Sequence, residues 1–428
     1  MERVPGTGAV VWSQFLLRLA SSAGVLVIGA YFVYLRDHAK PVNSLILGVV
    51  SALVFVTELS FAPLAGSLSD QRGRRLFLLG GPVLAAIAVL LIPLGIGIKT
   101  ALPLGLIVAI VGIARLVEGL GTAVAVPATL GFLAETTDGR PMSRGRVMGL
   151  FELASVIGIA AGAVLGPLLW DRLQLLAFVL LAGLYLVAAL MVLKVRETRY
   201  SRAPQVVFSA RRYLEILSYR PLALFIPTWI AANAILGVWV SAQIEFVLAA
   251  RLHVSGQHFV GSLHGRAGTL SEILGGYVLW FALCVIVWAL LLARFPRRAT
   301  LLVTIFGSVP ASVGLIALNH GGPPVAFIPL VLAGIFLEAG FTPTALAYLA
   351  DISQRFAHDR GRLMGLYSVM LGIGQLVGAG LGGLFAQIAY FDGLAYLTII
   401  LASMAVGSAA LSLLLTPPES GNALNGEV

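Results

Sequence analysis

Twelve apolar stretches, each about as long as a membrane-spanning helix, follow one another along this chain. The hydrocarbon core of a bilayer is about 30 Å thick and a helix rises about 1.5 Å per residue, so one crossing needs roughly 20 mostly apolar residues. The stretches are too long for barrel strands and lack their alternation of polar and apolar residues. We therefore predict an all-α polytopic membrane protein with spans near residues 11–34, 43–68, 76–98, 101–126, 146–170, 175–195, 222–249, 270–293, 299–318, 322–350, 362–386 and 391–415.

Composition excludes an ordinary soluble protein, because only 11% of the residues are charged, against about 25% in soluble domains. The net charge of +9 could indicate a nucleic-acid partner. Most arginines and lysines, however, fall on alternate loops, which is the positive-inside pattern of membrane proteins. The pattern predicts a multi-pass protein of the plasma or inner membrane, surrounded by lipid, with both termini in the cytoplasm and no nucleic-acid partner.

The second half of the chain repeats the first at a fixed offset. Pro127 recurs as Pro343 and Gly149 as Gly365, an offset of 216 residues. Duplicated halves are typical of secondary transporters, whose binding site lies between the repeats. We expect two pseudo-symmetric six-helix bundles, residues 1–195 and 222–416, joined by a cytoplasmic linker, 196–221, and followed by a disordered cytoplasmic tail, 417–428.

The loop between the second and third spans reads GSLSDQRGRR. Glycine allows close helix contact, the aspartate can pair with a cation or a helix end, and the arginines hold the loop in the cytoplasm. The spacing resembles the loop 2-3 signature of the major facilitator superfamily, which implies two six-helix bundles around a midplane cavity. We expect a conformational latch, although a purely topogenic role would also explain the arginines; the residues are Gly66, Asp70, Arg72, Gly73, Arg74 and Arg75.

Ionisable residues inside the spans should face the protein interior, because a charge in lipid is costly. In the fourth span, Arg115 and Glu118 are three positions apart on one helical face. This span resembles that of proton-driven members of the superfamily, whose arginine is implicated in proton transfer. We expect Arg115, Glu118 and Glu58 to couple transport to protons, and the alternative is a static pair that neutralises two buried charges.

The fifth span carries glycines at every fourth position, which flatten one helix face so that another helix can approach closely. The run resembles the span 5 motif typical of drug-exporting antiporters in the superfamily, and it recurs in the eleventh span. We expect a rocking seam between the halves, and generic helix packing is the alternative. The residues are Gly158, Gly162, Gly166, Pro167, Gly374, Gly378 and Gly382.

Together these features predict alternating access, with proton-coupled export of small amphiphilic or lipophilic compounds by a monomer. The alternatives are proton-coupled uptake of a polar metabolite or sugar, and translocation of a lipid or lysolipid. We expect no enzymatic activity and no cofactor, because no phosphate-binding loop or hydrolase constellation occurs. His253, His258 and His264 lack acids or cysteines at ligand spacing, so we expect no metal site. The expected cavity residues are Arg18, Trp229, Asn233, Glu245, Glu338 and Gln375.

Overall fold

The computed structural model describes residues 6–96, 102–136, 141–193, 195, 215, 217–291, 294–355 and 360–415. Over these residues the chain is helical, apart from connecting loops and one isolated bridge between Val254 and Gln257. The predicted all-α class is therefore confirmed. Nearly all of the expected linker and the tail lie outside the described residues, so the boundaries between the bundles stay a prediction.

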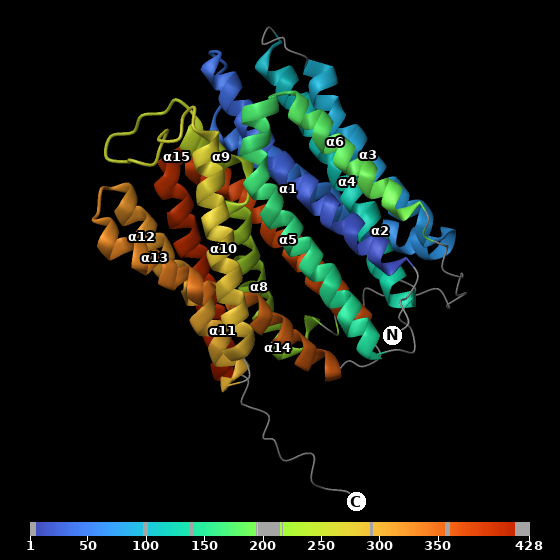
Figure 1. Cartoon of the computed structure of the whole chain (residues 1–428). Helices are drawn as coiled ribbons and strands as arrows, with labels where there is room; N and C mark the ends of the chain where they lie inside the picture. Colours follow the sequence, from blue (N-terminus) through green and yellow to red (C-terminus); the bar gives the residue numbers. More distant parts are fainter. Residues whose placement is uncertain are drawn as a thin grey trace, which may run out of the picture.

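The first half contains six long helices, in the order in which the sequence predicts six spans (Figure 1). Local signals define some of their ends. The side chain of Asn43 caps the second helix by accepting a hydrogen bond from the backbone N–H of Ile46 at 3.0 Å. That helix ends at Gly73, whose φ of 99° is readily available only to glycine. The helices are α1 (Thr7–Asp37), α2 (Ser44–Arg72), α3 (Arg74–Ile96), α4 (Leu104–Thr136), α5 (Pro141–Leu173) and α6 (Leu176–Val192).

The second half has shorter helical segments, because several of its spans are interrupted. The last long helix contains non-helical backbone at Ala389 and Tyr390 and is therefore two helices that meet at a kink. The segments are α8 (Arg220–Trp239), α9 (Ala242–Ala249), α10 (Ala267–Leu291), α11 (Arg297–Phe306), α12 (Ser308–Asn319), α13 (Pro324–Ala339), α14 (Phe341–Arg355) and α15 (Arg360–Leu415).

The seventh span differs from the prediction of one continuous helix over 222–249. Val240 and Ser241 leave the helical conformation between α8 and α9. Glu245 therefore belongs to a separate short helix and not to the helix that carries Trp229 and Asn233. Its position is set by the direction of α9 and not by the spacing from Asn233.

Within the part of the chain that the structure describes, ten helical stretches are long and apolar enough to cross a membrane by length and composition. One of them, Val369–Ser412, runs through the kink in α15 and so covers two predicted spans, and the shorter apolar helix Leu176–Val192 covers another. Each predicted apolar stretch thus falls on helix, and that each one crosses the bilayer stays a prediction.

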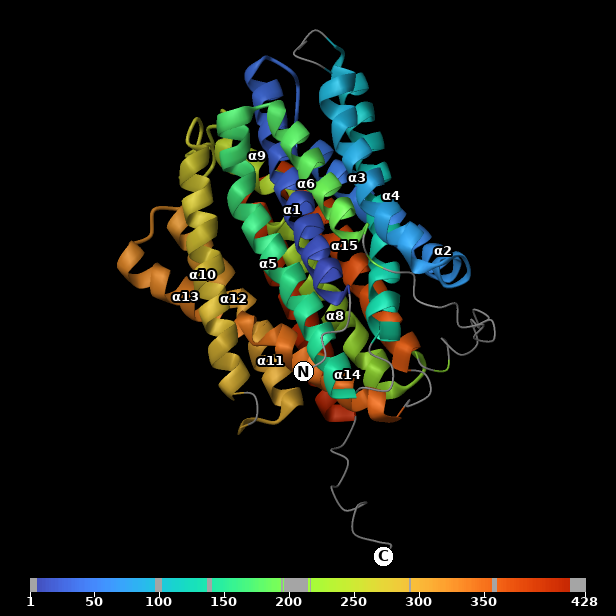
Figure 2. The same cartoon turned by 45° about the vertical axis from the view of Figure 1, so that its right-hand side comes forward.

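Over the described residues, the helices of one half pack mainly on one another, and four main helix pairs join the halves. Within the halves, α5 packs on α1, α4 on α2 and α3, and α8 on α15; between the halves, α2 meets α15 and α9, α5 meets α10, and α1 meets α9. α1 begins and α15 ends at one end of the bundle, here called the proximal end (Figure 1). α9 lies beside α1 toward the opposite, distal end in both views (Figure 2).

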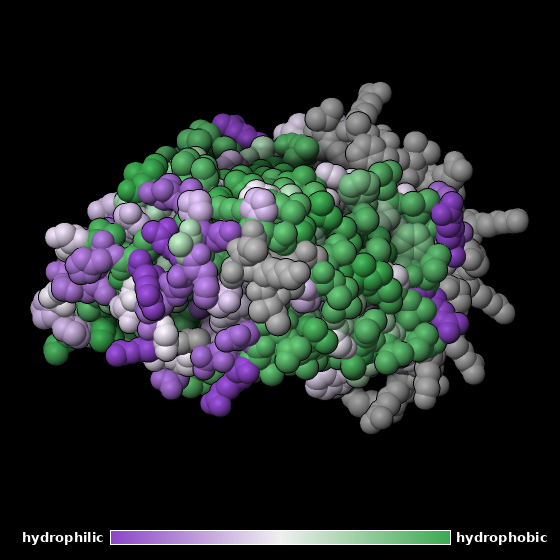
Figure 3. Space-filling model, turned by 90° about the horizontal axis from the view of Figure 1, so that it is seen from above, coloured by the Kyte–Doolittle hydropathy of each residue, from purple (hydrophilic) through white to green (hydrophobic). Residues whose placement is uncertain are grey.

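The surface of the molecule is largely apolar, as expected for a protein surrounded by lipid. Large side chains such as Leu94, Val325 and Leu414 are 79%, 89% and 81% exposed. Seen from the distal end, hydrophilic side chains gather over one side and hydrophobic ones cover much of the rest (Figure 3). A soluble protein rarely leaves so much contiguous apolar surface in water.

Candidate functional site

A charged pair lies fully buried in the first half, on the α4 face that points toward α6. The guanidinium of Arg115 donates to Oε2 of Glu118, and the hydroxyl of Tyr185 donates to Oε1 of Glu118 at 2.8 Å. Arg115 and Glu118 are each 2% exposed. Both carboxylate oxygens are thus satisfied, and the positive charge of Arg115 is compensated within the protein.

Each charge of the pair stabilises the other, because removing either partner would leave an unpaired charge in a low-dielectric interior. The arrangement fits a static pair and a proton-transfer pair equally well. Tyr185 could not be found from spacing, because it stands 67 positions from Glu118 on another helix.

A second acid of the first half lies near an arginine. Glu58 on α2 lies within the electrostatic influence of Arg18 on α1. The Arg18 backbone is close to α5, since a Cβ added to Gly158 would lie 3.0 Å from the Cβ of Arg18. No hydrogen bond or ion pair joins Glu58 to the Arg115 and Glu118 pair among the described residues.

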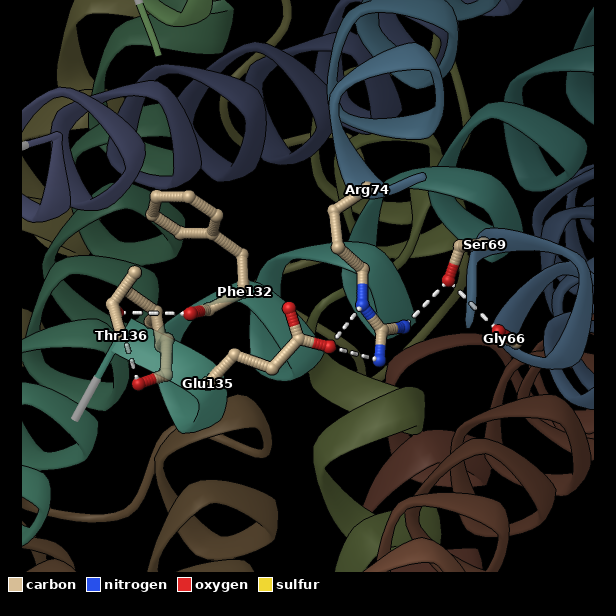
Figure 4. A network of polar contacts seen from close by, with 7 residues as sticks. Gly66, Ser69, Arg74, Phe132, Glu135 and Thr136 are labelled. Atoms are coloured by element: carbon tan, nitrogen blue, oxygen red, sulfur yellow. Dashed lines mark hydrogen bonds and ion pairs between the residues drawn. The ribbon is translucent and has the colours of Figure 1, made fainter. Parts of the chain in front are cut away.

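The loop between α2 and α3 is tied to α4 at the proximal end (Figure 4). Arg74 donates from Nε and Nη2 to Oε1 of Glu135, at 3.0 and 2.9 Å, and from Nη1 to the hydroxyl of Ser69 at 2.7 Å. Gly131 leaves the space that the guanidinium occupies, because a Cβ there would lie 2.3 Å from its central carbon. This contact holds three helices of the same half together.

The other residues of the expected latch lie around this contact. Arg75 donates to the carbonyl of Leu193 at 2.6 Å, Gly66 packs near Pro127 of α4, and Arg72 is exposed. The side chain of Asp70 lies outside the described residues. These contacts of Arg74 and Arg75 lie within the first half, and a latch across the halves stays a prediction.

The glycine runs lie inside each half and not at the expected seam between halves. A Cβ on Gly162 would lie 2.4 Å from the carbonyl oxygen of Leu19 on α1, and a Cβ on Gly378 would lie 2.0 Å from the carbonyl oxygen of Ala234 on α8. The neighbours Gly158, Gly166 and Gly374 meet the same two helices, and Gly382 meets Gln243 and Val238. The runs thus hold α5 on α1 and α15 on α8 by the same close packing.

Other glycines form the contacts between the halves. Gly48 of α2 meets Gly383 of α15, where an added Cβ would lie 2.6 Å from the opposite Cα. Gly29 of α1 meets the backbone of Ala242 on α9. Single glycines carry no periodic signal, so sequence reasoning missed both contacts.

The six residues expected to line one cavity are dispersed. Trp229 stacks on Phe341 with ring centroids 5.7 Å apart, and the amide of Asn233 donates to the carbonyl of Trp229, so these two lie in the core of the second half. Glu338 lies at the end of α13 near the hydroxyl of Ser308, and Gln375 is half-buried on α15. Glu245 is 2% exposed at the contact of α9 with α1.

Polar contacts at the distal end were not predicted. Asp37 of α1 lies 3.9 Å from Nε of Arg251 and 3.7 Å from Nδ1 of His264, across the two halves. Within the second half, Asp392 accepts from Asn319 at 2.8 Å and lies 2.7 Å from Nε2 of His320.

Among the described residues, no three histidine, cysteine, aspartate or glutamate side chains are grouped to hold a metal ion. Of the histidines considered in the sequence, His264 accepts a hydrogen bond from Nε of Arg251 at 2.9 Å.

Comparison with known proteins places the chain among membrane transporters. The model of the Major Facilitator Superfamily matches residues 11–263 and 254–428. Among curated proteins, no sequence matches the chain.

Solved structures of similar fold cover nearly the whole chain. A mutant of the nucleoside transporter NupG has a TM-score of 0.71 at 14% identity, covering 96% of this chain and 100% of its own. A bacterial homologue of the iron transporter ferroportin in an inward-facing state has a TM-score of 0.69 at 13% identity, covering 96% and 99%. A D-xylose-proton symporter has a TM-score of 0.69 at 15% identity, covering 96% and 97%. At these identities the likeness shows the fold alone.

Proposed function

Because this chain belongs to the Major Facilitator Superfamily, and is thus a secondary transporter and not an enzyme, we propose that it exports small amphiphilic or lipophilic compounds in exchange for protons. It works by alternating access, in which the two halves expose a site to one side of the membrane and then to the other. It resides in the plasma or inner membrane with both termini in the cytoplasm.

Proton coupling is supported by ionisable side chains held inside the helices of a membrane protein. Arg115 and Glu118 are each 2% exposed, a placement that is costly and is associated with proton relays. When Glu118 takes a proton, its attraction to Arg115 is lost, and the guanidinium is free to attract another acid or an anionic substrate. Glu58, within the influence of Arg18, is the second acid in this proposal.

Substrate binding is assigned to a cavity near the bilayer midplane, which would open when the halves move apart. Apolar compounds would be held there by aromatic surface next to Trp229, and orientation would come from polar groups. The polar groups are Arg18, Asn233, Glu338 and Gln375.

Export is supported by the glycine run of α5, which resembles that of exporting members of the family. Its packing against α1 gives a rigid helix pair that can move as one unit. The loop from Gly66 to Arg75, with Asp70, is proposed to close the proximal side in one state. Asp70→Asn should then reduce transport and leave membrane insertion intact.

Uptake of a polar metabolite is the second candidate. It is favoured by structural neighbours that are described as a nucleoside transporter and a D-xylose-proton symporter. Gln14 and Asn233, both buried polar residues on long helices, would supply hydrogen bonds to such a substrate.

Proteoliposomes with an imposed pH gradient test these alternatives. The probes are a fluorescent lipophilic amine, radiolabelled uridine, radiolabelled D-xylose and a fluorescent lysophospholipid, each assayed in both gradient directions. Export predicts that only the amine moves, and that it moves against the proton flow. Movement of uridine or D-xylose with the protons would establish uptake, and movement of the lysophospholipid would establish lipid translocation.

The coupling residues are tested in the same assay. The double variant Arg115→Gln with Glu118→Gln removes both charges together, and it should lower gradient-driven flux at least tenfold. Glu272→Gln removes an exposed acid of α10 and is the matched control, with unchanged flux. A double variant that transports like the unmodified protein would reject this assignment and leave the static pair.

A further inference from the structure

The contact between α1 and α9 brings a glycine and a glutamate together at the junction of the two halves. A Cβ added to Gly29 would lie 2.9 Å from the Cβ of Glu245 and 2.8 Å from the carbonyl oxygen of Ala242. Real side chains do not approach so closely, so α1 and α9 can meet here only because position 29 is glycine. The contact is therefore closed tightly in this conformation.

The two residues occupy equivalent positions of the internal repeat. The offset of 216 residues that relates Pro127 to Pro343 also relates Gly29 to Glu245. It likewise relates Leu26, which packs in the core of the second half, to Ala242, which packs in the core of the first. The contact between α1 and α9 thus joins equivalent positions of the two halves. Rocking of one half against the other must therefore open or close this contact.

The side chain of Glu245 is buried in this contact. The residue is 2% exposed, and among the described residues one of its carboxylate oxygens, Oε2, is fully buried and has no hydrogen-bond partner. This differs from Glu118, whose two oxygens are both bonded.

The cations nearest along the neighbouring helices are engaged elsewhere. On α1, Arg36 donates to the carbonyl of Val42 at 2.6 Å and lies over the ring of Phe246 at 5.6 Å. Arg18 lies within electrostatic range of Glu58, on α2.

The other titratable groups on the helices packed against α9 also have different surroundings. On α1, Asp37 faces Arg251 and His264, Tyr31 packs on Trp170 and Phe178, and Tyr34 packs on His38. On α15, Asp392 faces His320 and Asn319. On α2, Glu58 lies within the electrostatic influence of Arg18. None of these contacts supplies a cation to Glu245.

An ionised carboxylate in this position would be buried without compensation, which is strongly unfavourable, whereas the neutral acid costs far less. We infer that Glu245 is a proton-binding site whose occupancy is required for the distal contact between the halves to close. The carboxylate takes one proton from the aqueous phase while α1 and α9 are apart, and closure then buries the carboxylic acid. When the contact opens, water reaches the carboxyl group and the proton can be released. The site deepens the proposed proton-coupled transport and rests on it, because closure of the distal side then depends on a proton bound by the second half.

The inference predicts that distal closure consumes one proton. Where the hydrated carboxyl is ionised, the ratio of closed to open molecules should then fall up to tenfold for each unit of rising pH. This dependence is a property of the conformational equilibrium and needs neither substrate nor gradient.

Spin labels on exposed positions of the two halves at the distal end measure that equilibrium. Asp171→Cys and Ser262→Cys provide the sites, in a Cys284→Ala background that removes the chain's one cysteine. Distance distributions are recorded by pulsed electron paramagnetic resonance in nanodiscs from pH 5 to 9. The labelled protein should shift from short to long distances as the pH rises.

Three variants decide the assignment. Glu245→Gln, a neutral side chain of the same shape, should stay closed at every pH, and Glu245→Asp should keep the response to pH. Glu272→Gln, which removes an exposed acid, should respond like the labelled protein. A response that persists in Glu245→Gln, or that is abolished by Asp37→Asn and His264→Gln instead, would overturn the proposal.

A separate variant tests the contact itself. Gly29→Ala should favour long distances at all pH values, because the added methyl group cannot fit when the contact closes; unchanged distances would contradict the tight contact on which the inference rests. Should Glu245→Gln abolish the pH response while no probe moves with a gradient, the proton site stands and the proposed transport function fails.

Discussion

In the first half, the buried acid Glu118 forms an ion pair with Arg115 and the half-buried Glu58 lies within the electrostatic influence of Arg18, whereas in the second half Glu245 and Glu338 form no ion pair with a described cation. The helix packing of the halves is nonetheless alike, since the glycine runs of α5 and α15 fit their neighbours in the same way. The repeat has thus kept its backbone contacts and changed its charges. Compensated acids can remain ionised when buried, and uncompensated acids must be neutral or hydrated.

The largest expected difference between the halves is the cost of removing charge. Arg115→Leu would leave Glu118 as an unpaired buried charge and should lower stability by about 3–5 kcal/mol. Glu245→Gln removes a group that has no cation partner, so it should leave stability nearly unchanged. Thermal unfolding of both variants in detergent checks the pair of predictions, with Arg115→Leu plus Glu118→Leu as the control that restores stability. Equal losses for Arg115→Leu and Glu245→Gln would remove the distinction.

Tyr185→Phe probes the neutral part of the first-half network. It deletes the hydrogen bond of 2.8 Å to Glu118 and should cost about 1.5–3 kcal/mol, as expected for a bond to a charged acceptor. Tyr277→Phe is the control in the second half: Tyr277 lies near Glu338 but is 41% exposed and makes no hydrogen bond among the described residues, so the change should cost little. Chemical denaturation compares the two variants, and an equal loss at Tyr277 would show that the bond to Glu118 makes no contribution of its own.

The glycine runs test whether the scaffold is as symmetric as it looks. Gly162→Ala and Gly378→Ala each place a methyl group against a backbone carbonyl, at 2.4 and 2.0 Å, and should each cost about 1–3 kcal/mol through overpacking. Gly380→Ala has no atom within 4 Å of the new Cβ and is the matched control, expected to be neutral. Melting temperatures measure all three. If only one of the two packed glycines were sensitive, the halves would differ in packing as well as in charge.

The smallest effect is expected at the proximal end. Arg74 and Glu135 have side chains that are 12% and 37% exposed, so Arg74→Gln should cost at most about 1 kcal/mol. The stability lost in Arg74→Gln should be smaller at high salt, because salt screens exposed ion pairs. Unfolding at low and high ionic strength gives both values; a loss several times larger, insensitive to salt, would indicate that Arg74 has a role in conformation beyond this pair.

Sequence reasoning succeeded where one helix decides the outcome. Apolar length predicted the helices, and the spacing of Arg115 and Glu118 predicted their place on one face. It failed where the identity of the neighbouring helix matters, because periodicity defines a face and not what packs on it. For this reason the glycine runs were assigned to the wrong interface. The break at Ser241 was missed because no proline marks it in the sequence.

The meeting of Gly29 with Glu245 has a consequence for how such a molecule can be built. In a symmetric dimer of identical six-helix subunits, the residue beside the twofold axis faces a copy of itself, so a glutamate would oppose a glutamate and a glycine would bring no acid at all. Joining both copies in one polypeptide removes that identity. A single carboxyl group, that of Glu245, can then lie where the two halves meet, and the equivalent position in the other half, Gly29, has no side chain and so leaves room for it.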